Sequence, residues 1–155
     1  MNTTLKLIAS IMISFAAGAI GSLATVPNIA SWYARLEKPA LIPLNEVFGP
    51  VWTLLYLLMG ISLYLVWTAK KQHASRRAYI FFGTQLVLNS LWSIVFFGLH
   101  MPWLGVAVIL FLLVMIVLTM KAFATISRAA TWLLAPYVAW VGFATYLTIG
   151  VAVLN

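Results

Sequence analysis

The sequence predicts an all-α membrane protein built as a bundle of five transmembrane helices. Its 155 residues are 65% hydrophobic and only 7% charged, whereas soluble domains carry about 25% charged residues. These few charges could not cover the surface of a soluble fold, so the bilayer must be the solvent for most of the chain. Four long stretches contain no Asp, Glu, Lys or Arg: Leu7–Ala34, Val47–Ala69, Ala78–Met120 and Ala129–Asn155.

Five helical spans can be placed in these stretches. About 20 apolar residues cross the hydrocarbon core, and Ala78–Met120 is long enough for two spans separated by a turn at Pro102. A lipid-exposed backbone must satisfy its own hydrogen bonds, and the runs lack the alternation of a membrane barrel, so helices are predicted. We expect one domain, residues 1–155, with spans at about 5–26, 47–68, 78–99, 103–123 and 131–153.

The basic residues predict the orientation of the bundle. One side of the membrane receives Lys6, Lys70, Lys71, Arg76, Arg77, Lys121 and Arg128, and the other side receives only Arg35 and Lys38. By the positive-inside rule, the N-terminus should be cytoplasmic. Because these residues flank apolar runs and do not form one patch, the net charge of +7 does not indicate a nucleic-acid partner.

The chain offers little for metal or acid–base chemistry. It has no cysteine, two histidines and two acidic residues, Glu37 and Glu46. A zinc site would need nearly all of these side chains together, so we expect no metal site and no required cofactor. No charged residue lies inside a predicted span, which argues against an ion-coupled transporter.

One face of the third span combines polar and aromatic side chains. At helical spacing it carries Gln85, Asn89, Trp92, Ser93 and Phe96. A buried amide costs free energy unless it is hydrogen-bonded. Two interpretations follow: the amides of Gln85 and Asn89 bond neighbouring helices, or this face lines a ligand pocket.

Two other spans carry aromatic stripes at similar spacing. The second span has Phe48, Trp52, Leu55, Tyr56 and Met59, and the fifth has Trp132, Pro136, Trp140, Phe143 and Leu147. Core packing and anchoring at the membrane boundary would explain each stripe alone. Three such stripes with a few polar groups are typical of the lining of an apolar ligand pocket.

The segment 28–46 is predicted to close the outer end of the bundle as a lid. Pro39 and Pro43 stiffen it, and Trp32 and Tyr33 supply apolar anchors. Connections of this length are uncommon in compact domains and are often functional. The alternative is a solvated connector.

Small residues on the first span indicate a close helix contact. They form two pairs four positions apart, Ala17 with Gly21 and Gly18 with Ser22. Such pairs suit either a homodimer or packing within one chain.

Three motifs carry a family resemblance. They are "WYARLEKPALIPLNEVFGPVW" (32–52), "QLVLNSLWSIVFFG" (85–98) and "PYVAWVGFATYL" (136–147). In this order they resemble the motifs of the translocator protein family, also called TspO/MBR, tryptophan-rich sensory proteins or peripheral-type benzodiazepine receptors. The resemblance implies a bacterial member in the cell membrane, a five-helix bundle and a homodimer. The family's pair of loop prolines is incomplete here, because only Pro43 is present.

The resemblance also implies ligands and ligand-binding residues. Family members bind porphyrins such as protoporphyrin IX, isoquinoline carboxamides and benzodiazepines, and some bind cholesterol. The family positions carried onto this chain are Tyr33, Pro43, Trp52, Asn89, Trp92, Ser93, Trp140 and Ala144. Some bacterial members degrade protoporphyrin IX in light, which gives Trp52 and Trp140 a photochemical role. Ile149 stands where the proposed sterol motif has a tyrosine, so high-affinity sterol binding is not expected.

The predicted function is that of a membrane receptor for porphyrins and drug-like aromatic ligands. To the family positions, the aromatic stripes add Tyr56, Phe96, Phe143 and Leu147. Light-dependent breakdown of a bound porphyrin is a further expectation. The alternatives are a carrier of tetrapyrroles or membrane lipids, and a stress sensor that acts through a partner.

Overall fold

The computed structural model describes residues 2–69 and 76–155. All of its long elements are helices. The helices are α1 (Thr3–Ile29), α2 (Asn45–Thr68), α3 (Arg76–Ser93), α4 (Pro102–Ala124), α5 (Arg128–Leu133) and α6 (Ala135–Leu154). A π-helical turn, Ile94–Gly98, continues α3, and a short 3₁₀ turn, Tyr33–Arg35, follows α1. Five segments are long and apolar enough to cross a membrane, with α5 and α6 forming one of them. The predicted bundle of five transmembrane helices is confirmed.

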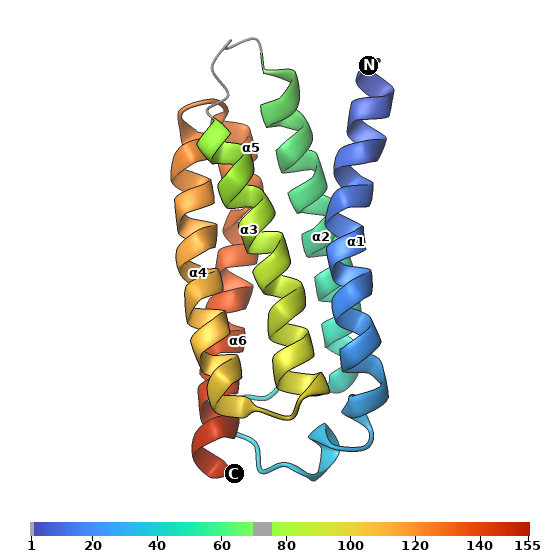
Figure 1. Cartoon of the computed structure of the whole chain (residues 1–155), viewed down its shortest axis with the longest axis vertical. Coiled ribbons are helices and arrows are strands. Elements are labelled where there is room, and N and C mark those ends of the chain that lie inside the picture. Colours follow the sequence, from blue (N-terminus) through green and yellow to red (C-terminus); the bar gives the residue numbers. More distant parts are fainter. Residues whose placement is uncertain (1, 70–75) are drawn as a thin grey trace.

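Pairwise contacts arrange the helices as a ring, and Figure 1 shows them side by side along the long axis of the molecule. α1 packs against α2 on one side and α3 on the other, α3 packs against α4, and α4 packs against α6. Contacts between α2 and α5 complete the ring. Neighbours in the ring are therefore not always neighbours in the sequence, because α1 contacts α3.

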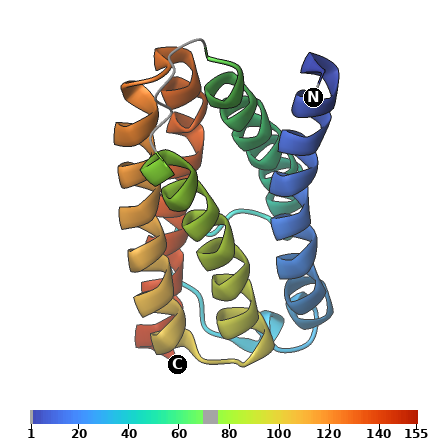
Figure 2. The ribbon, with the colours of Figure 1, turned by 45° about the horizontal axis from the view of Figure 1, so that its top comes forward.

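The connections gather at two opposite ends of the bundle. The N-terminus and the turn between α4 and α5 lie at one end (Figure 1). The segment between α1 and α2 and the C-terminus lie at the other end, where this segment crosses below the helices (Figure 2). Of the basic residues that predict the orientation, Lys70 and Lys71 lie outside the described residues.

Local signals explain several of the helix boundaries. The Asn2 side chain accepts a hydrogen bond from the Thr4 backbone N–H and caps α1. Pro102 begins α4, where its missing N–H costs nothing. Ser127 caps α5 by accepting from the Ala130 N–H.

The contact between α1 and α2 depends on a glycine. Gly60 is buried, and a Cβ atom at this position would lie 2.6 Å from the Ile11 Cα atom. Lipid tails are as apolar as the helices, so close packing has to supply much of the attraction between transmembrane helices. Gly60 therefore fixes how near α1 can come to α2.

The small residues of α1 pack within the chain. Ala17 accepts a hydrogen bond from Ser90 Oγ at its backbone oxygen. A Cβ atom on Gly21 would lie 3.0 Å from the Ser93 hydroxyl, and one on Gly18 would clash with the Tyr56 ring. Contacts to α2 and α3 thus account for these residues, and the homodimer stays a prediction.

Gly60→Val should separate α1 from α2. Overpacking of this kind costs about 1–3 kcal/mol, which should lower the thermal unfolding midpoint of the purified protein in detergent. Gly83→Val is the matched control, because a Cβ atom at Gly83 meets nothing within 4 Å. Equal midpoints for the two variants would contradict the close contact at Gly60.

Candidate ligand-binding site

A cavity of about 610 Å³ lies between α1, α2 and the C-terminal part of α3. The α1 wall consists of Phe15, Gly18, Ala19, Ser22, Thr25, Val26 and Ile29. The α2 wall consists of Asn45, Glu46, Phe48, Gly49, Trp52, Thr53 and Tyr56. Trp92, Ser93 and Phe97 supply the third wall, and Tyr33 reaches in from the connecting segment.

Aromatic rings form a continuous surface along one side of the cavity. Trp52 stacks on Tyr56 with a centroid distance of 5.6 Å and lies 6.5 Å from Trp92. The Trp92 ring stacks on Phe96 at 5.7 Å and meets Phe97 edge-on at 5.8 Å. Both phenylalanines belong to the π-helical turn that continues α3. Such turns are often found at functional sites.

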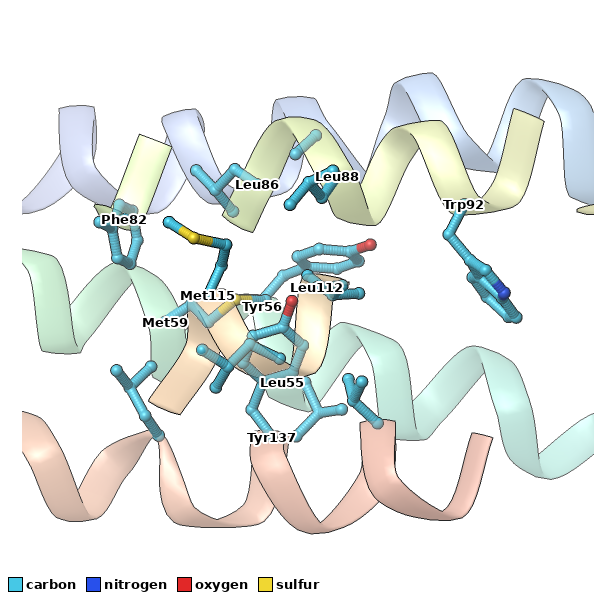
Figure 3. Close-up of a cluster of buried hydrophobic side chains, with 14 of the residues drawn as sticks. Leu55, Tyr56, Met59, Phe82, Leu86, Leu88, Trp92, Leu112, Met115 and Tyr137 are labelled. Carbon is cyan, nitrogen blue, oxygen red and sulfur yellow. The ribbon is translucent and has the colours of Figure 1, made fainter. Parts of the chain in front are cut away.

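A chain of hydrogen bonds supports this surface from behind. Tyr56 Oη donates to Asn89 Oδ1, and Asn89 Nδ2 donates to Tyr137 Oη at 3.2 Å. Tyr137 Oη in turn donates to Gln85 Oε1 at 2.8 Å. The chain joins α2, α3 and α6 and leaves both amides buried, so the helix-bonding interpretation of Gln85 and Asn89 is the one the structure supports. Figure 3 shows Tyr56 and Tyr137 within the apolar core, with Trp92 set apart from them.

Two indole N–H groups are buried without a hydrogen bond in the described part of the chain. They belong to Trp92, which lines the cavity, and Trp140, which does not. An unsatisfied buried donor typically costs about 1–3 kcal/mol.

Contacts at the start and in the middle hold the segment that connects α1 to α2. At its start, Trp32 stacks on His100 at 4.5 Å, and His100 Nε2 lies 3.0 Å from Asn28 Oδ1. Further along, the Asn155 side chain accepts from the Glu37 N–H and donates to the Glu37 oxygen, both at 3.0 Å.

Two contacts with α6 extend this attachment. Tyr146 Oη donates to the Ala40 backbone oxygen at 2.9 Å, and the Pro39 ring packs against Gly150. The connecting segment is thus fixed across the end of the bundle.

Tyr33 is the residue of this segment that enters the cavity wall. Its ring contacts Phe96 and Phe97, and burial raises the pKa of its phenol. Lys38 Nζ lies 5.0 Å from the centroid of the same ring. The phenol therefore stays uncharged at neutral pH and presents a ligand with a neutral hydroxyl.

The predicted site residues fall into three groups. Those that line the cavity are Tyr33, Trp52, Tyr56, Trp92 and Ser93. Asn89 and Phe96 lie directly behind this lining. The residues that do not line it are Pro43, Trp140, Phe143, Ala144 and Leu147. Four of these five belong to α6, whereas the cavity is formed by α1, α2 and the end of α3.

The sequence analysis did not assign the α1 wall to the site. Gly18, Ser22 and Thr25 line the cavity at helical spacing, but we had interpreted Gly18 and Ser22 only as part of a packing motif. A small or hydroxyl-bearing residue at each turn of an otherwise apolar helix was the available signal. Glu46 was likewise missed, because it falls in the segment 28–46 that is predicted to be a lid.

Comparison with known proteins identifies the family of this chain. The sequence profile of the TspO/MBR family matches residues 10–154. The chain belongs to the TspO/MBR family. It is 45% identical to the tryptophan-rich protein TspO of Archaeoglobus fulgidus over 151 residues, with 97% of each chain covered. It is 40% identical to the human translocator protein over 121 residues, covering 75% of this chain and 70% of the human one.

Family membership and the five apolar helices establish an integral, multi-pass membrane protein. In this TspO/MBR protein, the loop motif and the third-span motif meet at the cavity, through Tyr33, Trp52 and Trp92. The fifth-span motif supplies Tyr137 to the hydrogen-bonded chain. The three motifs are therefore brought together in space by the fold.

Asn89→Leu should weaken the junction of α2, α3 and α6. The substitution deprives Tyr56 of its acceptor and Tyr137 of a donor, so the free energy of unfolding should fall by about 1–3 kcal/mol. Thermal or denaturant unfolding in detergent measures this change. Ser22→Ala is the control, because the Ser22 hydroxyl bonds only to Ala19 of its own helix. An unfolding curve like that of the wild type would show that the chain of hydrogen bonds adds no stability.

Proposed function

We propose that this TspO/MBR protein is a membrane receptor for flat aromatic ligands, which bind in the cavity between α1, α2 and α3. Porphyrins such as protoporphyrin IX and ligands of the isoquinoline carboxamide or benzodiazepine type are the proposed classes. The observation that carries the proposal is the continuous surface of Trp52, Tyr56 and Trp92, whose rings a flat ligand can stack on. The cavity volume lies in the range of about 300–1,000 Å³ that suits small-molecule sites.

The proposal includes light-dependent breakdown of a bound porphyrin. Trp52 lines the cavity, so an excited porphyrin would lie against an electron-rich indole. Trp140 is one ring further away, because it contacts Phe48, which lines the cavity, with a centroid distance of 5.8 Å. We therefore assign Trp52 the direct photochemical role and Trp140 a secondary one.

A carrier of tetrapyrroles or lipids is the second candidate. Several cavity residues, including Val26, Gly49 and Thr53, are exposed on the outside of the bundle. These residues belong to α1 and α2, so the cavity opens towards the side of the bundle, where ligands dissolved in the bilayer could enter. Passage of a bound porphyrin across a sealed proteoliposome would favour the carrier, and its consumption in place would favour the receptor with photochemical activity.

We further propose that the protein is a homodimer in a bacterial cell membrane with a cytoplasmic N-terminus. The charge distribution along the sequence supports this orientation. The end that carries the α1–α2 segment would then face outward, and the cavity lies next to that segment, with Tyr33 in its wall.

Trp52→Phe should separate binding from photochemistry. Phenylalanine keeps much of the stacking area but is far harder to oxidise, so protoporphyrin IX affinity should stay within about tenfold, or 1.4 kcal/mol. Light-dependent loss of the porphyrin absorbance should slow sharply. Trp140→Phe is the matched comparison and should slow the bleaching less. If Trp52→Phe bleaches the porphyrin as fast as the wild type, Trp52 has only a packing role.

The α1–α2 segment is proposed to act as a lid, and its attachment to α6 gives the test. Asn155→Ala together with Tyr146→Phe removes three hydrogen bonds to the segment. At about 0.5–1.5 kcal/mol each, their loss should speed ligand dissociation several-fold in a stopped-flow measurement. Tyr64→Phe removes a hydroxyl on α2 with no partner in the described chain and should leave the rate unchanged. A double variant with the wild-type dissociation rate would identify the segment as a plain connector.

A further inference from the structure

We infer that Glu46 sets the charge preference of the cavity: ligands that are uncharged or cationic at their outer end are favoured over ligands that carry carboxylates there. This inference rests on the proposed function, because it concerns ligands of the same cavity. It names a residue that determines specificity.

Among the residues that the structure describes, Glu46 is the one with a formal charge in the wall of the cavity. It lies in the first turn of α2 and is exposed, as is the neighbouring Asn45. Trp52 lies more than one turn, and Tyr56 more than two turns, further along the same helix. Glu46 and both rings line the same cavity, so a ligand stacked on Trp52 and Tyr56 would share the cavity with the Glu46 carboxylate.

The cations of the connecting segment lie outside the cavity wall. Arg35 and Lys38 are the basic residues of this segment, and neither lines the cavity, although Lys38 Nζ approaches the Tyr33 ring. Lys38 Nζ donates to the backbone oxygens of Ala34 and Leu36, at 3.3 and 3.2 Å. Its side chain instead borders a separate groove against α6. Within residues 2–69 and 76–155, no ion pair forms with Glu46.

Charge at this position should matter more than on an ordinary protein surface. The cavity wall is predominantly apolar, so the effective dielectric beside it is lower than in water and the interaction between two charges is stronger. A carboxylate placed beside Glu46 would be repelled, and an ammonium or amide N–H would be attracted. Protoporphyrin IX carries two propionates, and its dimethyl ester carries none.

Glu46 also has a simpler role to consider. An acidic residue in the first turn of a helix is stabilised by the positive N-terminal end of the helix dipole. That role concerns the stability of α2 and does not depend on the charge of a ligand. A test must therefore compare ligands that differ in charge and must not rely on stability or on overall affinity.

The experiment compares protoporphyrin IX with its dimethyl ester on three proteins: wild type, Glu46→Gln and Glu37→Gln. Glu37 is the matched control, because it is the other acidic residue, is exposed, and does not line the cavity. Affinities come from titrations that follow quenching of tryptophan fluorescence. The quantity compared is the ratio of ester affinity to free-acid affinity, because the different partitioning of the two porphyrins into detergent cancels between proteins.

Glu46→Gln should improve the relative binding of the free acid by about three- to tenfold, as expected for one close charge interaction in a partly screened site. Raising the salt concentration should reduce the wild-type preference, because salt screens exposed charges. Glu37→Gln should behave like the wild type.

Three results would overturn the inference, and they can be told apart. If both porphyrins bind and the affinity ratio is the same in all three proteins, Glu46 does not set charge preference and the proposed receptor function stands. If neither porphyrin quenches any of the three proteins, the proposed function fails and the inference fails with it. A change of equal size in Glu37→Gln would indicate a general effect of net charge and would also refute a specific role for Glu46.

Discussion

The hydrogen-bonded chain of Tyr56, Asn89, Tyr137 and Gln85 joins three helices through side chains that are all buried. In the bilayer, apolar side chains gain little by leaving lipid for protein, so directional contacts of this kind help fix which helices meet and in which register. Tyr56 belongs both to this chain and to the cavity wall. The packing of the bundle and the shape of the site therefore depend on the same interaction.

The cavity is bounded by helices with different surroundings. α1 has the smallest buried share of the five spans, 22%, against 56% for α3 with its π-helical end. Residues such as Gly18 and Ser22 contribute little bulk, so the α1 wall leaves space in front of the aromatic rings of α2 and α3. One thinly packed helix thus separates a ligand from lipid, while the rings that would hold it are fixed to the core.

Helical spacing was sufficient to predict the five spans and to place Trp52, Asn89 and Trp92 towards the interior. Spacing defines a face of a helix but not the helix that this face meets, so it could not show that Asn89 bonds Tyr56 and Tyr137 behind the cavity wall. For the same reason the α6 residues Phe143 and Leu147 were expected in a pocket that opens elsewhere in the ring. Contacts between elements distant in sequence decide these points, and a periodic pattern does not contain them.

The attachment of the connecting segment to the end of α6 has a consequence for biogenesis. Asn155 bonds Glu37 across 118 positions of sequence, and Tyr146 bonds Ala40 across 106. When the first two spans enter the membrane, the groups that hold the segment between them have not yet been synthesised. These contacts can therefore form only after α6 has been synthesised, so the attachment of the segment to α6 is a late step in the assembly of the bundle.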